Sequence, residues 1–429
     1  MYEKDYDSYI GVKVESGKKN ISVICAIAFL YFTRYSFLSF ATTFSISTAL
    51  VGGSMMILFL ALLFYYTLRN PSRIPWDGVL IVFLILLFFQ ITILIHPEYQ
   101  YRFDDAYHDG RFSAQKIFQF GAGLYTYFLI RLFRRSKGKL YKLFSVIAYV
   151  ILFFDIWVAF IGRSEEYSMS FGYQMALAAI IFLARYLEES KQKMHLLLSL
   201  FCIGMGVLYG SRACVITYVL FAVVYMLWKG KFEWKHLLIG ALGLMAAISI
   251  NSTAIMKIVY KAAASIGFQS RTLYMLSVGD IMGTDSSRQV RLWPVLIEQL
   301  KNMPFYKGMW AYGDRTLFPT YYGYCHNFIL EILVTFGILV GGAFLLWMFI
   351  GFIRTIRHNK DTNGLMTVVF GCFALAKLSF SNTFWQEPYF WTFIAMLVNC
   401  AAQRRKEKKT MIIRIPKRAI QELGGQTAL

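Results

Sequence analysis

Three short segments place arginine or histidine among glycine, serine and aromatic residues in a way that apolar packing does not explain. Arg212 lies in the turn Gly-Ser-Arg-Ala. Arg288 begins the run Arg-Gln-Val-Arg-Leu-Trp, and His326 lies in Tyr-Cys-His-Asn, directly before an apolar stretch. Taken one at a time, the three also fit structural roles: an interfacial anchor, a solvated loop charge and a helix-terminal residue. Together they indicate a polar site.

These residue types suit the transfer of a sugar from a lipid diphosphate. Breaking the anomeric C–O bond leaves negative charge on the diphosphate, and the planar fork of arginine binds phosphate bidentately while staying protonated. Arg212 and Arg288 are the candidates for that role, which needs no metal. His326 is the candidate general base, because an imidazole accepts a proton near neutral pH.

Further residues on the predicted outer side are candidates for substrate binding, although cations at a membrane edge are often only anchors. They are Arg291, Arg163, Arg111, Lys116 and Tyr173. Arg34 and Asp155 lie within apolar stretches, where an ionisable residue is a functional candidate by default. A structural ion pair between these two is the other interpretation, and the one we favour.

The elements that position these residues are membrane helices. Of the 429 residues, 57% are hydrophobic and only 16% are charged, whereas soluble proteins have about 25% charged residues. A span needs about 20 mainly apolar residues, and twelve stretches qualify. Their predicted centres are Ala28, Ile57, Ile85, Leu124, Ile151, Ala179, Leu200, Phe221, Leu244, Val340, Phe370 and Ala395.

The distribution of lysine and arginine predicts the orientation. Most of the 44 basic residues fall in segments that are cytoplasmic when both termini are inside, as the positive-inside rule requires. The formal net charge of +20 is therefore mainly an orientation signal. Nucleic-acid binding is not expected, because the basic runs adjoin spans and do not form a patch on a soluble domain.

The predicted organisation is an all-α polytopic membrane protein with one large outer loop between the ninth and tenth helices. Within that loop, Asp-Ser-Ser ahead of an apolar pattern over residues 290–300 predicts a capped amphipathic helix lying over the outer mouth of the bundle. The expected divisions are 1–20, a cytoplasmic segment; 21–251, helices one to nine; 252–324, the outer loop; 325–402, helices ten to twelve; and 403–429, a basic cytoplasmic tail.

Neither a metal nor a cofactor is expected. The sequence contains no Cys-x-x-Cys, His-Glu-x-x-His or Walker-type loop, the motifs that commonly mark metal and ATP sites. Its six cysteines lie in or beside predicted spans, as packing residues do. The pair Asp104-Asp105 is a weak candidate for a divalent ion.

The order of these features resembles the O-antigen ligase and polymerase superfamily, the bacterial membrane enzymes that transfer or polymerise lipid-linked oligosaccharides. The resemblance covers most of the chain and includes the span number, the late outer loop and the Ser-Arg turn. Its other motifs are Arg288-x-x-x-x-Trp293, Asn302-x-Pro304-x-x-x-Gly308 and His326-Asn327. Residues 167–173 are similar to polymerase members. The chain departs from many relatives at Met309-Trp310, where they continue Gly-x-Gly.

This resemblance implies a GT-C-like, metal-independent and inverting glycosyltransferase in the bacterial cytoplasmic membrane. Its substrates would be undecaprenyl-diphosphate-linked repeat units of an O-antigen, capsule or exopolysaccharide, joined on the outer face. Membrane lipids and a chain-length regulator are the other expected partners.

Two alternatives remain open at this stage. A ligase would use the same donor and the same arginine and histidine chemistry, but would move the glycan onto lipid A core, a wall polymer or a protein. A flippase or other secondary transporter would also suit twelve spans. Transporters usually contain internal repeats and broken helices near the membrane midplane, and the sequence shows no convincing similarity between its halves.

Overall fold

A computed structural model describes most of the chain, and all its regular secondary structure in the described part is helical. The described residues are 4–99, 123–136, 138–160, 169–189, 192–208, 212–230, 252–265, 273–274, 277–278, 287–318, 325–379 and 381–414. Within them, the side chains of 4–20, 135, 160, 169, 207–208, 212–213, 252, 255–256, 263, 287–291 and 408–414 are not described.

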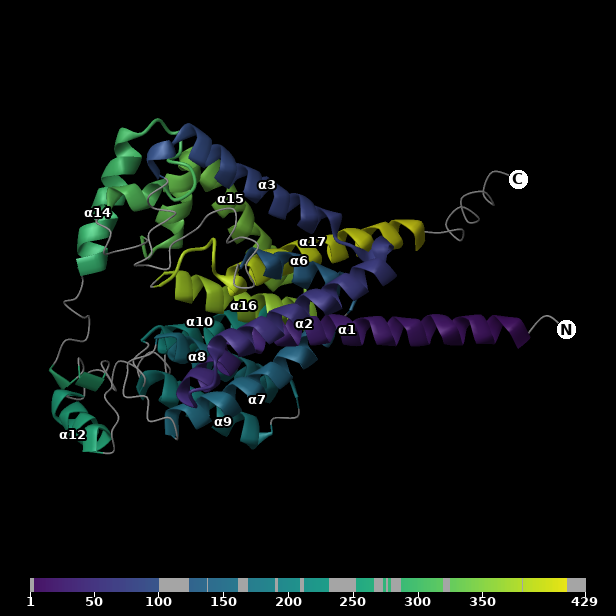
Figure 1. The fold of residues 1–429 in the computed structure, drawn as a ribbon, viewed down its shortest axis with the longest axis horizontal. Coiled ribbons are helices and arrows are strands. Elements are labelled where there is room, and N and C mark those ends of the chain that lie inside the picture. The colour runs from purple at the N-terminus through teal and green to yellow at the C-terminus, as the bar shows by residue number, and fades with distance from the viewer. Residues whose placement is uncertain are drawn as a thin grey trace, which may run out of the picture.

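Figure 1 shows the arrangement of the helices. The α-helices are α1 (Lys4–Thr43), α2 (Thr48–Arg69), α3 (Trp76–Ile95), α6 (Leu124–Leu132), α7 (Lys139–Phe160), α8 (Met169–Glu188), α9 (Lys193–Leu208), α10 (Arg212–Lys229), α12 (Ser252–Ser265), α14 (Ser287–Asn302), α15 (Phe328–His358), α16 (Thr362–Leu378) and α17 (Pro388–Arg414). Short 3-10 turns are η1 (Pro71–Arg73), η2 (Pro97–Tyr99), η3 (Phe133–Arg135) and η4 (Gly313–Leu317).

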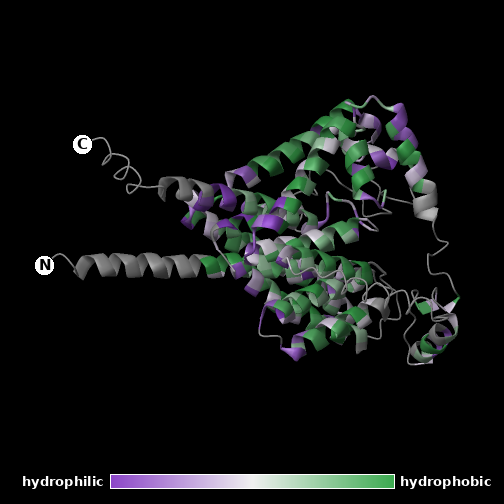
Figure 2. Cartoon of the chain, turned by 180° about the vertical axis from the view of Figure 1, so that it is seen from behind, coloured by the Kyte–Doolittle hydropathy of each residue, from purple (hydrophilic) through white to green (hydrophobic). Residues whose placement is uncertain are grey.

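Six of these helices are long and apolar enough to cross a membrane. They are α1 from Ile21, α2, α3, α7, α8 and α15. Large apolar side chains point outward from α2 and α3, where Ile57 is 68% exposed and Leu94 79%. Figure 2 shows hydrophobic residues along most of the helices. Such continuous apolar surfaces are costly in water and are stable in lipid, so the chain is a polytopic helical membrane protein.

The predicted span centres fall within helices wherever the structure describes them, although Leu124 is the first residue of α6 and not its centre. Eleven of the twelve lie within described helices, and Leu244 lies outside the described residues. The helices α9, α10 and α16 are shorter apolar helices. The expected divisions at residues 20 and 402 fall inside continuous helices, since α1 starts at Lys4 and α17 runs to Arg414. The full count of twelve spans stays a prediction.

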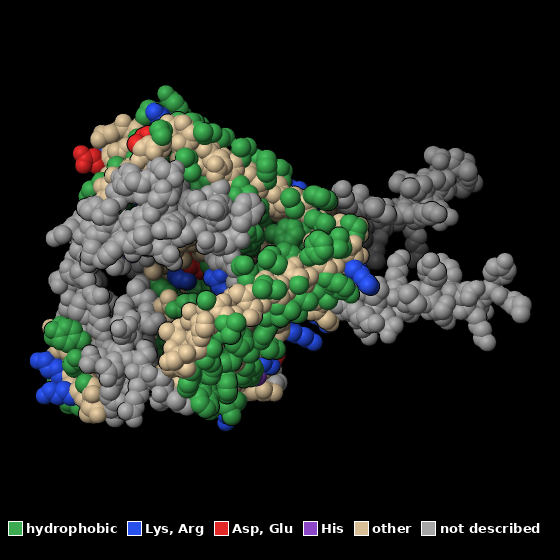
Figure 3. Space-filling model, viewed as in Figure 1, with side chains coloured by type: hydrophobic (Ala, Val, Ile, Leu, Met, Phe, Trp, Pro, Cys, Tyr) green, Lys and Arg blue, Asp and Glu red, His purple; other side chains and the backbone are tan. Residues whose placement is uncertain are grey.

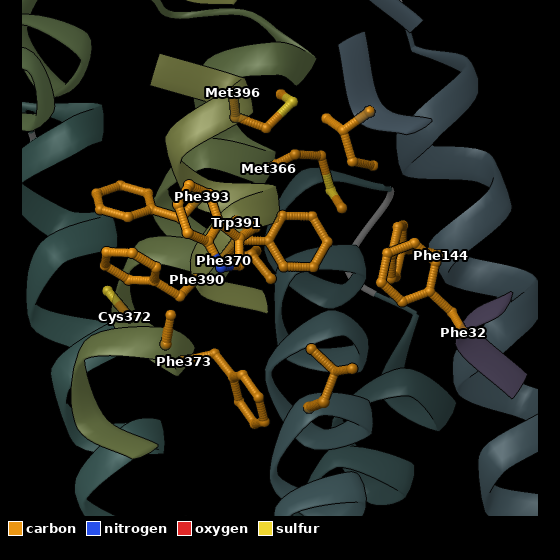
Figure 4. Close-up of a cluster of buried hydrophobic side chains, with 14 of the residues drawn as sticks. Phe32, Phe144, Met366, Phe370, Cys372, Phe373, Phe390, Trp391, Phe393 and Met396 are labelled. Carbon is orange, nitrogen blue, oxygen red and sulfur yellow. The ribbon is translucent and has the colours of Figure 1, made fainter. Parts of the chain in front are cut away.

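The core of the bundle is aromatic. Figure 4 shows Phe370 and Phe373 of α16 near rings of α17, with Phe144 of α7 and Phe32 of α1 beside them. The rings of Phe32 and Phe144, and those of Phe144 and Phe370, are 4.7 Å apart in edge-to-face geometry, the favoured arrangement for aromatic pairs. Helix α16 is buried along most of its length, and most of its residues are accordingly apolar.

Consecutive helices of the bundle run antiparallel and define two ends. We call one the basic end: it holds the first residue of α1, the last of α17, and the connections 70–75, 133–138, 189–192 and 359–361. There, Arg131 donates to Asp77 at 2.7 Å and Lys229 pairs with Glu188 at 2.7 Å. The opposite, distal end holds the connections 44–47 and 379–387 and the start of α15.

The expected helix of the outer loop is present. It is α14, which extends beyond the predicted 290–300 at both ends and contains Pro294 in its interior. Its apolar side packs into a second buried cluster, which includes Leu292, Leu296, Cys325 and Val334. Figure 1 shows α14 across the distal end of the bundle. The polar side of α14 therefore faces away from this cluster.

The long helix α15 is broken at Gly337, whose φ of 79° and ψ of 164° are not helical. Three backbone hydrogen bonds join the residues around this break to the segment that follows α14. They are Leu339 N to Phe305 O at 2.9 Å, Met309 N to Val334 O at 2.7 Å and Trp310 N to Thr335 O at 3.0 Å. These bonds satisfy groups that the helix leaves unpaired, which a membrane interior requires.

Glycine is needed on both sides of this contact. A Cβ on Gly308 would overlap the carbonyl oxygen of Thr335 and lie 2.6 Å from the nitrogen of Gly337. Gly337 in turn has the positive φ that only glycine adopts readily. The pair explains why Gly308 closes the Asn-x-Pro-x-x-x-Gly motif. The close contact of these two backbones also holds η4, which begins at Gly313, against α15.

Candidate functional site

A cavity of about 250 Å³ opens near the distal end of the bundle, between α1, α8, α16 and the connection to α17. Three charged side chains line it: Arg34, Lys377 and Glu387. In Figure 3 basic and acidic side chains are visible in a hollow beside an apolar surface. Ionisable groups at this depth in a membrane protein are costly and commonly functional.

Lys377 is held by rings and by one carboxylate. Its Nζ lies 5.0 Å from the ring centre of Tyr173 and 5.8 Å from that of Tyr389, within the range of cation–π attraction. It also pairs with Glu387 at 2.8 Å. These contacts hold the ammonium group in place on the cavity wall, where its side chain is 16% exposed.

Glu387 is fully buried and has several partners. Its carboxylate accepts from Asn382 Nδ2 at 2.8 Å and from the backbone N–H of Tyr389 at 3.4 Å, in addition to Lys377. A buried carboxylate is tolerated when it is paired and hydrogen-bonded in this way. The connection 381–388 thus forms a rigid wall of the cavity.

The predicted ion pair between Asp155 and Arg34 is wrong, because Asp155 is bound by Gln174. The amide nitrogen of Gln174, turned toward α7, donates to both Asp155 carboxylate oxygens at 3.1 and 2.8 Å and lies 3.0 Å from the Ser36 hydroxyl. Arg34 lines the cavity, and its guanidinium carbon lies 5.7 Å from the ring centre of Tyr31. Gln174 therefore lies between Asp155 and the cavity: it binds the Asp155 carboxylate and also lines the cavity wall.

Tyr173, which the sequence predicts to bind substrate, lines the cavity. Arg212 begins α10, close to the same wall. The Sγ of Cys214, two residues further on, donates to the carbonyl oxygen of Gly172 at 2.6 Å. The start of α10 is thereby fixed beside Tyr173, while the Arg212 side chain lies outside the described residues.

His326 lies at the distal end, just before α15. It is buried and has a φ of 54°, an uncommon conformation for a non-glycine residue and one worth attention. The next residue, Asn327, caps α15 by accepting from the backbone N–H groups of Ile329 and Leu330, as asparagine does well. The positive φ of His326 and the cap at Asn327 therefore fix the backbone position of His326 relative to α15.

The start of α15 packs against the same connection that walls the cavity. Glu331 accepts from the hydroxyl of Thr383 and from the backbone N–H of Phe384. The rings of Phe328 and Phe390 are 6.5 Å apart. The connection 381–388 is thus shared: it contacts α15 through Thr383 and lines the cavity through Glu387.

The remaining nominated residues are placed only in part. Arg288 and Arg291 lie in the first turns of α14, and their side chains are outside the described residues. Arg111, Lys116 and Arg163 lie wholly outside them, as do Asp104 and Asp105. The structure therefore brings Tyr173, the start of α10 and the connection 381–388 together, and places α14 and His326 at the same end.

A buried ionic group lies where η4 meets α15. Asp314 is 1% exposed, and both its carboxylate oxygens are without a hydrogen-bond partner among the described residues. Burial raises the pKa of Asp314 to about 6, and the neighbouring Arg315 opposes that rise. The Arg315 guanidinium stacks on the Tyr312 ring, 3.7 Å from its centre. This group is closed to solvent, so we regard it as part of the scaffold.

Arg34, Lys377 and Glu387 were not assigned to the site from the sequence. Their signal was present, because an ionisable residue within or at the end of an apolar stretch is unusual. In the part of the chain that the structure describes, no group of three or more histidine, cysteine, aspartate or glutamate side chains is arranged to hold a metal ion. The six cysteines are free thiols, five of them buried.

Comparisons with protein-family models, with curated proteins and with solved structures find no match to this chain.

Proposed function

We propose that this protein is a membrane glycosyltransferase that polymerises oligosaccharide repeat units carried on undecaprenyl diphosphate. The observation that carries the proposal is the cavity with Arg34, Lys377 and Glu387. It lies beside the start of α10, where the sequence places Arg212, and shares the connection 381–388 with the start of α15, where His326 lies. A polar, cationic site inside an apolar bundle suits a substrate whose headgroup is anionic and whose tail is lipid.

In this proposal the reaction is a single displacement. The oxygen of an acceptor hydroxyl attacks the anomeric carbon of the donor sugar, and the bond from that carbon to the diphosphate oxygen breaks. His326 takes the hydroxyl proton. Arg212 and Arg288 stabilise the charge that develops on the leaving diphosphate. Substitution from the opposite face inverts the anomeric carbon.

The topology of the proposal follows the charge distribution. The basic end is cytoplasmic and the distal end faces outward, in a bacterial cytoplasmic membrane with both termini inside. The architecture is then a GT-C-like bundle of about twelve spans whose outer loop, residues 252–324, includes α12, α14 and η4. Donor and acceptor are both lipid-linked oligosaccharides, and a chain-length regulator is a further partner.

A lipid-linked oligosaccharide flippase is the second candidate, and the break in α15 is the observation that favours it. Broken helices mark substrate sites in many transporters. Here, however, the backbone groups around Gly337 bond to Phe305, Met309 and Trp310. They serve to dock η4, and this is why we place the flippase second.

Substitution of three residues tests the proposal. Arg212→Ala, Arg288→Ala and His326→Ala should each lower the rate of glycan lengthening by about 10²–10³-fold, since each removes a group that acts on developing charge or on the proton. The measurement is polymer chain length on gels, at equal membrane levels of each variant. Lys301→Ala is the matched control, because Lys301 is an exposed cation on the same helix as Arg288. Normal chain length in all three variants would overturn the assignment.

A further inference from the structure

The composition of α3 fixes its depth in the membrane. The helix has 20 residues, and the sequence contains no aspartate, glutamate, lysine or arginine between Asp77 and Glu98. At a rise of about 1.5 Å per residue the helix is about 30 Å long, which is also the thickness of the hydrocarbon layer. The whole of α3 is therefore needed to cross that layer, and any tilt would draw its ends further inward. The last residues of α3 thus mark the distal edge of the hydrocarbon.

The segment that joins α14 to η4 reaches below this edge. The ring of Trp310 stacks on that of Phe88, with 5.4 Å between the ring centres, and the backbone N–H of Ala311 donates to the Thr92 hydroxyl at 3.4 Å. Phe88 and Thr92 precede the end of α3 at Ile95 by about two turns and about one turn, or about 10 Å and about 5 Å along the helix. Trp310 and Ala311 therefore lie at membrane depth, although they belong to the predicted outer loop.

The backbone of this segment has the partners that such a depth requires. Irregular backbone is tolerated inside a membrane only where protein or a water-filled cavity satisfies its polar groups. Met309 and Trp310 donate to carbonyl oxygens just before the break in α15, and Phe305 accepts from Leu339 just after it. The helices α3 and α15, which lie side by side in Figure 1, thus supply these bonds together.

The first part of the segment carries aromatic side chains that point away from the core. A turn closed by the bond from Lys307 N to Pro304 O at 2.9 Å has Phe305 and Tyr306 at its tip, where these residues are 60% and 65% exposed. Their rings contact each other edge to face, with 5.6 Å between the centres. The bond from Leu339 N to Phe305 O, at 2.9 Å, places the turn beside α15.

The surface of α15 next to the turn identifies the partner as lipid. Ile338 and Val340 are 45% and 55% exposed, and the sequence of α15 has no charged residue between Glu331 and Arg354. An apolar helix surface of this kind is stable in hydrocarbon and costly in water, and the turn continues it. Lys307, which ends the turn, is exposed. Its long side chain can reach the headgroups from a shallow position only, so the turn lies close to the distal edge.

We infer that residues 305–311 form a re-entrant segment inserted into the distal leaflet of the membrane, with Phe305 and Tyr306 in contact with lipid acyl chains. Trp310 and Ala311 pack against α3 and α15, and the turn before them faces lipid. The segment thereby holds the end of α14 at the membrane surface. This inference goes beyond the proposed function and does not depend on it.

Collision measurements with a spin label test the depth of the turn. The purified full chain carries Cys25→Ala, which removes the one cysteine that is not buried, and is reconstituted into phosphatidylcholine vesicles. A nitroxide is attached to Phe305→Cys or to Tyr306→Cys. Leu94→Cys on α3, where Leu94 is 79% exposed, is the lipid reference. Lys301→Cys near the end of α14, also at an exposed position, is the water reference.

The two collision reagents separate lipid, water and protein. Oxygen enters hydrocarbon, whereas a nickel chelate is excluded from it. At both turn positions we expect nickel collisions at least about tenfold below those at Lys301→Cys, because polar groups are costly to transfer into hydrocarbon. Oxygen collisions should match those at Leu94→Cys. Nickel collisions as frequent as at Lys301→Cys would place the turn in water and overturn the inference. Low rates with both reagents would place it against protein and would also overturn it.

A charge substitution tests the same contact without a label. Phe305→Asp puts a carboxylate into hydrocarbon, so its melting temperature in the vesicles should fall several degrees below that of Phe305→Leu. Lys301→Asp is the matched control and should change the melting temperature little. Equal melting temperatures for the two Phe305 variants would contradict the inference. Neither experiment measures glycan lengthening, so failure of the proposed function would leave the re-entrant segment in place, and failure of the segment would leave the proposed function in place.

Discussion

At the scale of single residues, buried ionisable side chains lie in two kinds of environment. Lys377 and Glu387 are paired, hydrogen-bonded and placed on a cavity wall. Asp314 is enclosed beside Arg315, and its oxygens have no partner among the described residues. The first arrangement borders the cavity near the distal end. The second pays a desolvation cost that shows as a raised pKa, and its effect should be visible in stability.

The pH dependence of stability tests Asp314. Because the pKa of Asp314 in the fold is about 6, above its value of about 3.9 in an unfolded chain, the folded state binds more protons between these values. Its contribution to stability is therefore greatest below about pH 4 and declines as pH rises to about 6. Asp314→Asn, which stays neutral, should gain thermal stability relative to the parent protein as pH rises from 4 to 7.

The measurement is the difference in melting temperature between Asp314→Asn and the parent protein at each pH, in one detergent. Taking the difference cancels the titration of groups that do not interact with Asp314; Glu331, which interacts with it electrostatically, is the exception. A difference that stays constant, or that falls as pH rises, would show that burial does not raise this pKa.

At the scale of elements, the contact between the post-α14 segment and the break in α15 organises the distal end. Gly308 and Gly337 allow two backbones to approach, and the hydrogen bonds of Met309 and Trp310 hold them. The sequence indicated Gly308 as part of a motif, but not that it would meet Gly337. That contact depends on tertiary packing between segments about 30 residues apart in the chain, which local patterns do not encode.

Two glycine substitutions on this contact and beside it should have opposite effects. Gly308→Ala should destabilise the protein by more than the about 1–3 kcal/mol typical of overpacking, because the new methyl group meets rigid backbone at Thr335 and Gly337. Gly342→Ala, on the same helix α15, meets nothing within 4 Å and should be neutral or stabilising by about 0.5–1 kcal/mol. Thermal unfolding in detergent measures both; equal effects would refute the docking contact.

At the scale of the whole molecule, much of the fold could be predicted because membrane helices leave a strong local signal. Eleven predicted centres fall within described helices, and the loop helix lies where its apolar pattern placed it, while the predicted cap residues Asp285 and Ser286 lie outside the described residues. The cavity could not be predicted. Its charged residues come from α1, from α16 and from the residue before α17, and no periodicity relates Arg34 to Lys377.

The residues of the candidate site could be predicted only in part, because they come together from distant parts of the chain. Tyr173 was recognised through a motif and lies on the cavity wall, whereas Arg34 was interpreted chiefly as a structural partner of Asp155. The structure instead pairs Asp155 with Gln174 and places Arg34 on the cavity wall. A buried amide can replace an ion pair, and composition alone does not reveal which of the two a bundle uses.

The measurement that tests the central claim most directly uses the purified full chain in detergent with undecaprenyl-diphosphate-linked repeat units and no other protein. A polymerase should convert them into a ladder of longer lipid-linked products, because joining units requires no membrane sidedness. Units that remain unextended, although the same preparation moves them across the bilayer of a proteoliposome, would contradict the account and identify a flippase.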